Sequence, residues 1–377
     1  MSLYTTPLQI GYFMGLLFTV LFFWRGKKEE RLTDLFMGAL MLILTLEIQD
    51  YTFGFAGINF LWTTLNGFPR DASLLFGPAV YFYLLSQAHR DFTLKSKDLL
   101  HLLPFSIFFL LNLFVFLMGG HAVQSFQSSQ FGEWVDVVGT LVRWGSYFYY
   151  FYKSFGLYGA YRLWLVEVHS DPDKHDLRWF RNFLIILAIG VTFTETMGLI
   201  DYYLDLSFYE DWWWNLWLVG VIILTGIRAY AQPQWIAIGR QPAPPDETEV
   251  SRETSGVEQD DKNLIAVMEK VDRVLKVEKS YLQPDLNLGL LSEAVKLPAT
   301  EVSRAINKVK GMNFNDYVNS FRVEEFKRVA MKPENRKLTL LALAHDSGFN
   351  SKATFNRVFA KREGQSPGTW LRQQMAS

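Results

Sequence analysis

The sequence predicts an all-α protein, with a seven-helix transmembrane bundle followed by a soluble domain that contains two helix-turn-helix motifs. Three observations predict this class. Apolar runs of about 20 residues, the length that crosses ~30 Å of hydrocarbon, occupy residues 1–235. Apolar residues at helical spacing occupy residues 262–377. The segment between them, residues 236–261, is rich in Pro, Glu, Thr and Ser and has almost nothing to bury, so we expect a disordered or extended linker.

The formal net charge of -1 hides an uneven division of charge along the chain. Residues 262–377 contain 20 Lys+Arg against 12 Asp+Glu, a net of +8, whereas residues 241–261 contain one Arg against seven acids, a net of -6. A basic domain behind an acidic linker favours a polyanionic partner, although an ordinary charged surface explains the charge equally well. The chain has no cysteine, which excludes disulfides, cysteine zinc sites and cysteine nucleophiles.

Seven apolar runs are candidate membrane spans. They cover residues 7–24, 32–51, 72–88, 99–118, 137–158, 183–204 and 212–230. Lys and Arg gather in the loops after the first, third and fifth runs, starting with Arg25, Lys27, Lys28 and Arg31, whereas the opposite loops contain only Arg70. Because loops rich in Lys and Arg stay in the cytoplasm, we expect the N-terminus outside and the C-terminus inside. An odd number of spans is what this orientation requires.

Three ionisable residues lie within the spans at a similar depth. At 1.5 Å per residue, Glu47, Arg143 and Glu195 all fall in the outer half of the bilayer. Ionisable groups at membrane depth usually face the bundle interior or a wet cavity. We therefore expect a candidate signal pocket in which Glu47 and Glu195 flank Arg143, with Asp50 and Asp201 nearer its mouth. A structural ion pair that holds the helices together is the alternative.

Other patterns in the first half are weaker. Gly11 and Gly15 match the GxxxG spacing of a close helix contact. Acidic residues and a histidine crowd the loop at 171–176, but no metal-ligand spacing is recognisable. The chain also lacks metalloprotease, P-loop, dinucleotide-binding and triad-like patterns. We therefore expect no enzyme activity, no catalytic residues, no metal and no cofactor.

The basic half contains a series of predicted helices. They cover residues 263–279, 288–295, 299–309, 315–331, 338–346 and 352–361, and Pro367 begins a closing helix. Gly348 is expected to supply a positive φ in the turn before the sixth of these helices, with Asn350 or Ser351 as its N-cap. Two helix pairs joined by one long helix can place two recognition helices in successive major grooves, about 34 Å apart.

Residues 263–372 resemble the AraC/XylS family of bacterial transcription regulators. The most specific matches are Leu343, Ala344, Gly348, Phe349, Phe355, Asn356, Arg357, Phe359, Gly364 and Pro367 in the second repeat, and Ser303, Arg304, Ala305, Ile306, Asn307, Gly311, Asn313, Phe314, Tyr317 and Arg322 in the first. The layout with seven predicted spans before this domain is similar to that of the membrane-embedded members of the family. Two short segments look like features of that group, Gly77-Pro78 and His101-Leu102-Leu103-Pro104-Phe105. The chain departs from the family at Pro298, Ala353, Asn356 and Ala360, which replace the usual Ser, Ser, Ser and Lys.

The resemblance implies which residues read DNA. The first recognition helix would present Thr300, Ser303 and Arg304, and the second would present Lys352, Ala353, Asn356 and Arg357. Arg can pair with guanine, Asn with adenine, and an Ala methyl can meet thymine. Lys308, Lys310 and Lys361 are better placed for phosphate contacts. A surface salt bridge is the alternative for each Arg, and Arg304 could reach Glu301.

These patterns predict a membrane-bound, one-component transcriptional regulator in a bacterial cytoplasmic (inner) membrane, with its C-terminal domain in the cytoplasm. Expected partners are double-stranded promoter DNA, the lipid bilayer, a second copy of the chain, RNA polymerase, and an unidentified small-molecule or membrane signal. Two alternatives remain. One is a membrane enzyme or transporter with an appended DNA-binding regulatory domain, and the other is a receptor whose tail binds a protein.

Overall fold

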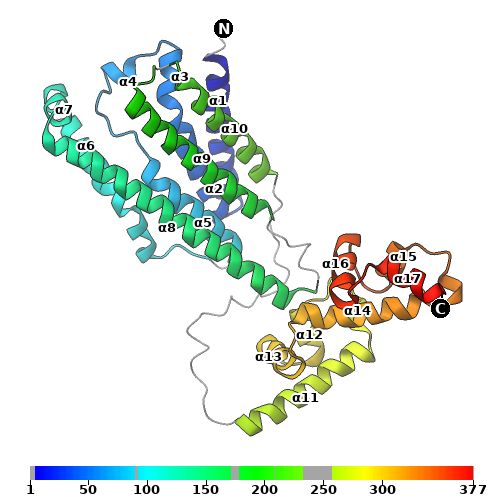
Figure 1. The fold of residues 1–377 in the computed structure, drawn as a ribbon. Helices are drawn as coiled ribbons and strands as arrows, with labels where there is room; N and C mark the ends of the chain where they lie inside the picture. Colours follow the sequence, from blue (N-terminus) through cyan, green and yellow to red (C-terminus); the bar gives the residue numbers. More distant parts are fainter. Residues whose placement is uncertain (1–4, 90–91, 171–177, 208, 232–256, 377) are drawn as a thin grey trace. The chain divides into compact units, whose positions relative to one another are not determined.

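The structure is a computed structural model that describes residues 5–89, 92–170, 178–207, 209–231 and 257–376. All regular secondary structure in these residues is helical (Figure 1). The chain divides into two compact units. One comprises Met1–Tyr158 and Arg178–Ile236, and the other comprises Gly159–Leu177 and Ala237–Ser377. The second unit is therefore made from two separate pieces of chain, whereas the sequence predicts one continuous C-terminal domain.

The first unit is a bundle of helices of unequal length. Its elements are α1 (Thr5–Lys28), α2 (Leu32–Glu47), α3 (Gln49–Phe55), α4 (Phe60–Thr63), η1 (Ser73–Leu75), α5 (Phe76–Ala88), η2 (Ser96–Leu102), α6 (Leu103–Leu117), α7 (Gly120–Gln127), the larger part of α8 (Gln130–Val168), α9 (Arg178–Leu204) and α10 (Trp212–Tyr230). Helix α1 packs against both α2 and α10, α2 also packs against α5, and α9 packs against α10 (Figure 1).

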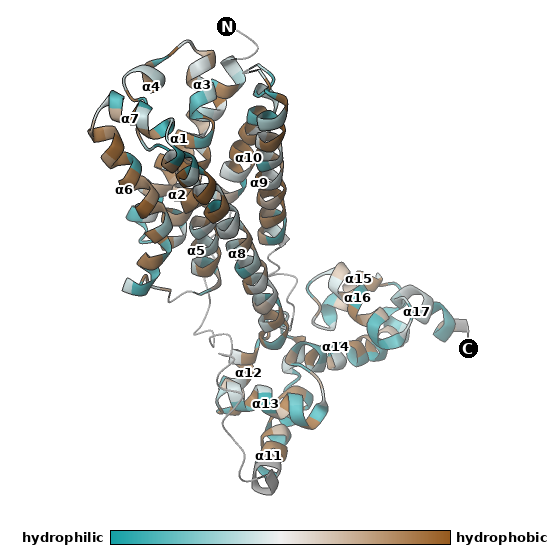
Figure 2. Cartoon of the chain, turned by 60° about the vertical axis from the view of Figure 1, so that its left-hand side comes forward, coloured by the Kyte–Doolittle hydropathy of each residue, from teal (hydrophilic) through white to brown (hydrophobic). Residues whose placement is uncertain are grey.

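Among the described residues, four helical stretches are long and apolar enough to cross a membrane. They are α1, η2 with α6, α9 from Trp179, and α10; a fifth is added if α2 and α3, bent by 42° at their junction, form one span. Figure 2 shows the hydrophobic residues that run along α6. The third predicted run coincides with η1 and α5, and α5 has only 13 residues. The fifth lies in α8, which has 39 residues but does not meet the same criterion of apolarity.

Two glycines allow α1 to approach its neighbours closely. A Cβ atom added to Gly11 would overlap the side chain of Val219 on α10, and one added to Gly15 would overlap the hydroxyl of Thr45 on α2. The GxxxG spacing therefore marks a real helix contact, in which each glycine faces a different partner helix. Small residues permit this approach in membrane bundles because their backbones can come together.

Replacing Gly15 by alanine is expected to destabilise the bundle by about 1–3 kcal/mol, the usual cost of overpacking. Gly220→Ala on α10 is the matched control, because nothing lies within 4 Å of an added Cβ there and alanine favours the helix by about 1 kcal/mol. Thermal unfolding of the full-length protein in nanodiscs measures both. Equal melting temperatures for the two variants would contradict the close contact at Gly15.

Arg25 joins three helices at one end of the first unit. Its guanidinium pairs with the buried carboxylate of Asp34 on α2, with Nε–Oδ2 at 2.7 Å and Nη2–Oδ1 at 2.9 Å. The Nη1 atom also donates to the carbonyl of Tyr230, the last residue of α10, at 3.0 Å. A two-pronged arginine–carboxylate pair fixes orientation as well as charge. Arg25, which the sequence counts among the loop charges, is therefore a packing residue of the bundle.

The second unit contains the two predicted helix pairs. Its elements are α11 (Val257–Lys276), η5 (Ser280–Leu282), α12 (Leu288–Val295), α13 (Ala299–Lys310), α14 (Phe314–Ala330), η6 (Pro333–Asn335), α15 (Leu340–Asp346), α16 (Lys352–Glu363) and α17 (Pro367–Ala376). Helix α11 begins at Val257, so the last residues of the expected linker are helical. The rest of that linker, residues 236–256, and the acidic loop at 171–176 lie outside the described residues.

Local capping explains where several of these helices begin. The side chains of Asn287, Asn313, Thr339 and Ser351 each accept a hydrogen bond from a backbone N–H in the first turn of the following helix. Ser351 therefore caps α16, whereas Asn350 donates to the carbonyl of Pro284 at 2.7 Å. Pro298 precedes α13 without a side-chain cap, which is the consequence of its replacing a serine.

Helix α14 connects two hydrophobic cores. Phe314, Tyr317 and Val318 in its first half belong to a core with α11, α12 and α13. Val323, Phe326 and Ala330 in its second half belong to a core with α15, α16 and Trp370 of α17. Each helix pair thus has a core of its own, and α14 fixes the two pairs relative to each other.

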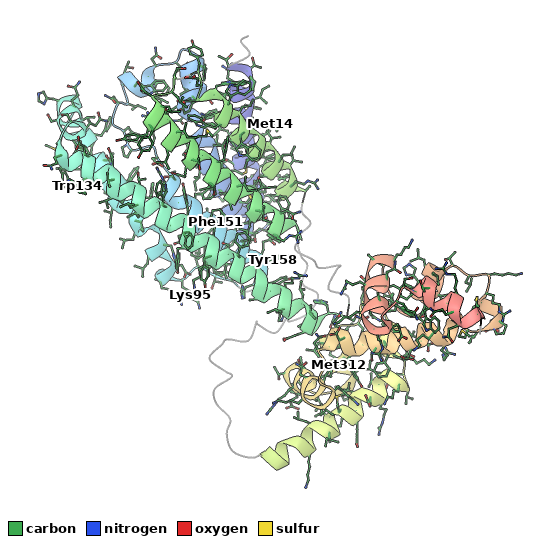
Figure 3. The ribbon with its side chains drawn as sticks, viewed as in Figure 1. Met14, Lys95, Trp134, Phe151, Tyr158 and Met312 are labelled. Atoms are coloured by element: carbon green, nitrogen blue, oxygen red, sulfur yellow. The ribbon has the colours of Figure 1, made fainter. Side chains whose placement is uncertain are left out.

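The end of α8 also lies in the first of these cores. Trp164, Leu165 and Val168 are buried together with residues of α11–α14. Tyr158, labelled in Figure 3, is the last residue of α8 in the first unit. The sequence assigns the residues after 158 to an inner loop. The structure instead continues the helix and buries one of its faces in the basic domain.

Candidate nucleic-acid interface

The turn between α15 and α16 depends on one glycine. Gly348 has a φ of 88°, in the left-handed region that side chains rarely adopt. The neighbouring Ser347 is fully buried, and its hydroxyl donates to the carbonyl of Leu343 at 2.7 Å. The predicted positive φ at Gly348 is confirmed, and it aims α16 away from α15.

Helix α16 separates its buried and exposed residues cleanly. Thr354, Phe355, Val358 and Phe359 are buried against the second core. The five residues that the resemblance or the charge assigns to DNA are all exposed: Lys352, Ala353, Asn356, Arg357 and Lys361. They recur at the spacing of one helix face. A side chain must be exposed on one face to enter a major groove, and this set meets that condition.

Helix α13 presents a similar stripe. Thr300, Arg304 and Lys308, each four residues apart, are exposed, while Val302, Ala305 and Ile306 are buried. Ser303 is half-buried at the edge of this stripe. Met312, labelled in Figure 3, lies in the short connection that follows α13. The structure therefore places every predicted DNA-reading residue on α13 or α16, and all but Ser303 are exposed.

One lysine on each of these helices forms an ion pair with an acidic residue of another helix. Lys361 contacts Asp316 at 2.9 Å, and Lys310 contacts Asp272 at 3.5 Å. Exposed pairs of this kind contribute only about 0–1 kcal/mol. A DNA phosphate can therefore replace the carboxylate at little cost, and the phosphate role expected for both lysines is compatible with the observed pairs.

Comparison with known proteins gives one match, which lies within the second unit. Residues 291–373 match a family model described as a helix-turn-helix domain, which is of the AraC type. No curated protein and no solved structure matches the chain. The match supports a DNA-binding transcriptional regulator that binds double-stranded DNA, and it covers α13 and α16 with the turn between α15 and α16. Residues 1–290 lie outside it.

The first unit contains a cavity near the predicted signal pocket. Its empty space, including its open mouth, is ≈ 490 Å³. Most of its wall is apolar. The polar side chains that line it are Glu47, Ser73, Tyr147, Thr194 and Glu195. They come from α2, η1, α8 and α9.

The structure brings together three of the five predicted pocket residues. Glu47 and Glu195 line the cavity, and Arg143 pairs with Glu195, with Nε–Oε1 at 3.2 Å. Arg143 also contacts Asp71 at 3.8 Å. Asp50 instead pairs with Arg70, with Nη2–Oδ2 at 2.8 Å, and Asp201 does not line the cavity. Neither Asp50 nor Asp201 is therefore among the residues that line the cavity.

Sequence reasoning missed several polar residues around this cavity. Tyr147 follows Arg143 by four residues on α8, so helical spacing could have found it. Trp144 donates its indole N–H to Glu195 at 2.7 Å. Ser73 lies in the short 3₁₀ helix before α5, and no pattern in the sequence connects it with a site.

Arg357→Ala is expected to weaken binding to a specific operator by about 1–3 kcal/mol, on the order of 5- to 150-fold. The arginine can pair with both acceptors of a guanine, and alanine cannot. Fluorescence anisotropy of the full-length protein in nanodiscs, on duplexes recovered from its genomic sites, measures the loss. Lys361→Ala is the control and should weaken binding to all duplexes alike. Unchanged operator affinity for Arg357→Ala would remove this residue from the reading face.

Proposed function

We propose that this protein is a membrane-bound one-component transcriptional regulator. Residues 1–235 form a seven-span sensor bundle with the N-terminus outside, and residues 262–377 form an AraC-type domain in the cytoplasm that binds promoter DNA sequence-specifically. The bundle responds to an external or membrane signal. The bacterial cytoplasmic membrane, a homodimeric state and contact with RNA polymerase belong to the same proposal.

One observation carries this proposal. The same chain contains four or five stretches fit to cross a membrane and an AraC-type helix-turn-helix domain with exposed recognition faces. Each of the seven apolar runs coincides with a helix or with consecutive helices, which supports seven crossings. The Lys and Arg asymmetry of the loops supports an inward C-terminus, although Arg25 is engaged with Asp34.

The cavity supports the sensing role. It contains Glu47 and Glu195 beside Arg143, and ionisable groups at membrane depth are functional-site candidates. Helix α8 supplies Arg143 and Tyr147 to this region and also supplies Trp164 and Leu165 to the core of the DNA-binding unit. A movement of α8 can thus transmit the binding of a ligand in the cavity to the DNA-binding unit.

Genome-wide mapping of DNA bound by the full-length, membrane-tethered protein tests the regulator function. We expect sharp peaks in promoters that share a short motif, and we expect a reporter fused to the C-terminus to be active only in the cytoplasm. Arg304→Ala combined with Arg357→Ala should abolish the peaks without releasing the protein from the membrane fraction. An external C-terminus, or peaks that survive the double substitution, would refute the proposal.

A further inference from the structure

The cavity of the first unit has an unbalanced charge. Two carboxylates, Glu47 and Glu195, line it, and Arg143 is already paired with Glu195. The side chain of Glu47 is exposed, and within the part of the chain that the structure describes no group forms a hydrogen bond or ion pair with it. A carboxylate surrounded by apolar groups is unfavourable unless a cation or a hydrogen-bond donor joins it.

A second group in the same cavity lacks a partner. Ser73 is only 4% exposed, and its hydroxyl oxygen has no hydrogen-bond partner among the described residues. Native proteins satisfy most buried polar atoms, so an orphan hydroxyl that lines a cavity indicates a missing ligand or water. The rest of the wall, including Ile43, Leu187 and Leu218, offers apolar contact to the body of such a ligand.

We propose that this cavity binds a cationic ligand with an apolar body, of the amine class. The ammonium group pairs with Glu47 and hydrogen-bonds the Ser73 hydroxyl, while the apolar body fills the space between α2, α9 and α10. This assignment rests on the proposed sensing function of the bundle and names the chemistry of its signal.

The test uses three matched probes on the full-length protein in nanodiscs: 2-phenylethylamine, 2-phenylethanol and 3-phenylpropanoate. The amine is expected to raise the melting temperature by a few degrees at saturating concentration, whereas the alcohol and the carboxylate leave it unchanged. Glu47→Gln should abolish the shift. Glu133→Gln, an exposed residue at the start of α8 outside the cavity, should preserve it.

A shift of equal size with the alcohol, or a shift that survives Glu47→Gln, overturns the amine assignment. So does the absence of any shift with the amine. These results leave promoter occupancy by the same protein untouched, so failure of the ligand class is distinguishable from failure of the regulator function.

A second inference rests on different residues, in the second unit. Ser170, just beyond α8, is almost fully buried against one face of α14. Its carbonyl accepts from Asn315 Nδ2 at 2.7 Å, from Asn319 Nδ2 at 3.1 Å and from Arg322 Nη1 at 3.5 Å. Its hydroxyl donates to the carbonyl of Leu286 at 2.5 Å. These three α14 residues lie on one helix face, at spacings of four and three.

The partner of this polar face comes from outside the matched helix-turn-helix region. Residues 291–373 contain Asn315, Asn319 and Arg322 but not Ser170. Without Ser170, the two asparagine amides lose these acceptors in a buried position, which is unfavourable. Trp164, Leu165 and Val168 add an apolar contact to the same core. The basic domain is therefore complete only when the end of α8 occupies this place.

We infer that the segment from Tyr161 to Ser170 is an internal docking segment that controls the DNA-binding domain. When docked, it holds α14 in place, and α14 sets the separation of α13 and α16. Withdrawal of the segment loosens the core formed by α11–α14. Helix α14 then no longer holds the recognition helices α13 and α16 at a fixed separation. The docking segment is thus the point at which a movement of α8 changes DNA binding.

Trp164→Ala in the full-length protein tests this role. Operator affinity should fall on the order of 5- to 150-fold, the range of coupling between linked sites. Hydrogen exchange should accelerate in α11, α12 and the first half of α14, while the core around Phe326 and Phe359 stays protected. Leu163→Ala is the matched control, because that neighbouring side chain is 70% exposed, and it should change neither readout.

Unchanged operator affinity in Trp164→Ala would overturn the docking role. Loss of protection throughout α12–α17 would overturn it too, because the segment would then be needed for folding and not for control. Ser170→Ala keeps the carbonyl acceptor and removes only the hydroxyl, so it should produce the same pattern with a smaller loss of affinity.

Discussion

Gly348→Ala is expected to disrupt the second helix-turn-helix pair while the first pair stays folded. An added Cβ would overlap the carbonyl oxygen of Tyr281 and lie 3.0 Å from Leu282 Cα. Both are backbone atoms, which cannot move as a flexible side chain can. The left-handed φ adds about 1–2 kcal/mol for a residue with a Cβ, and overpacking adds about 1–3 kcal/mol. Hydrogen exchange of α15 and α16 in the full-length protein measures the loss.

Gly364→Ala is the matched control for this substitution. Gly364 also has a positive φ, 70°, but nothing lies within 4 Å of an added Cβ. Only the conformational cost of about 1–2 kcal/mol remains, so α16 should stay protected. If the two variants lose protection equally, the close approach to Tyr281 is not what makes Gly348 necessary.

The basic half could be predicted from sequence because its signals are local. The turn glycine, the caps at Ser351 and Asn313, and the apolar spacing of each helix all depend on residues within about one turn of each other. The structure accordingly has these helices within a few residues of the predicted bounds. Only α11 starts clearly earlier, because the acidic residues after Val257 can continue its first turns.

The end of α8 could not be placed from sequence. Trp164, Leu165 and Val168 form an apolar stripe that suits lipid, a helix bundle or a domain core equally well. Their actual partners, on α11–α14, follow about a hundred residues or more later in the chain. The hydrogen bonds of Ser170 are equally non-local. Spacing within one helix shows which face is apolar but not what covers it.

The cavity shows the same limit in another form. Counting residues along a span gives the depth of Glu47, Arg143 and Glu195, and the structure does place all three around one region. Depth alone does not give the direction in which a side chain points around its helix. Asp50 has a suitable depth but faces Arg70, and Ser73 enters the cavity from the short 3₁₀ helix before α5, whose path the sequence does not reveal.

Arg322→Ala is expected to destabilise the DNA-binding unit the most. The side chain is 1% exposed, and its guanidinium donates to the carbonyls of Tyr281 and Gln283 at 2.8 and 2.9 Å and to the Ser170 hydroxyl at 3.1 Å. Alanine leaves these acceptors without their donor inside the protein. Each buried polar group left unsatisfied costs about 1–3 kcal/mol, so several together approach the ~5–15 kcal/mol that holds a typical domain folded.

Urea-dependent pulse proteolysis of the full-length protein, with fragments of the second unit quantified separately, measures this effect. Arg336→Ala is the control, because Arg336 is exposed in the connection before α15 and surface substitutions usually change stability by less than about 0.5 kcal/mol. Arg322→Lys should recover only part of the stability, since a single ammonium cannot reproduce the fixed fork of a guanidinium. If Arg322→Ala and Arg336→Ala unfold at the same urea concentration, the network between Ser170, α14 and the Tyr281 segment contributes nothing to the fold.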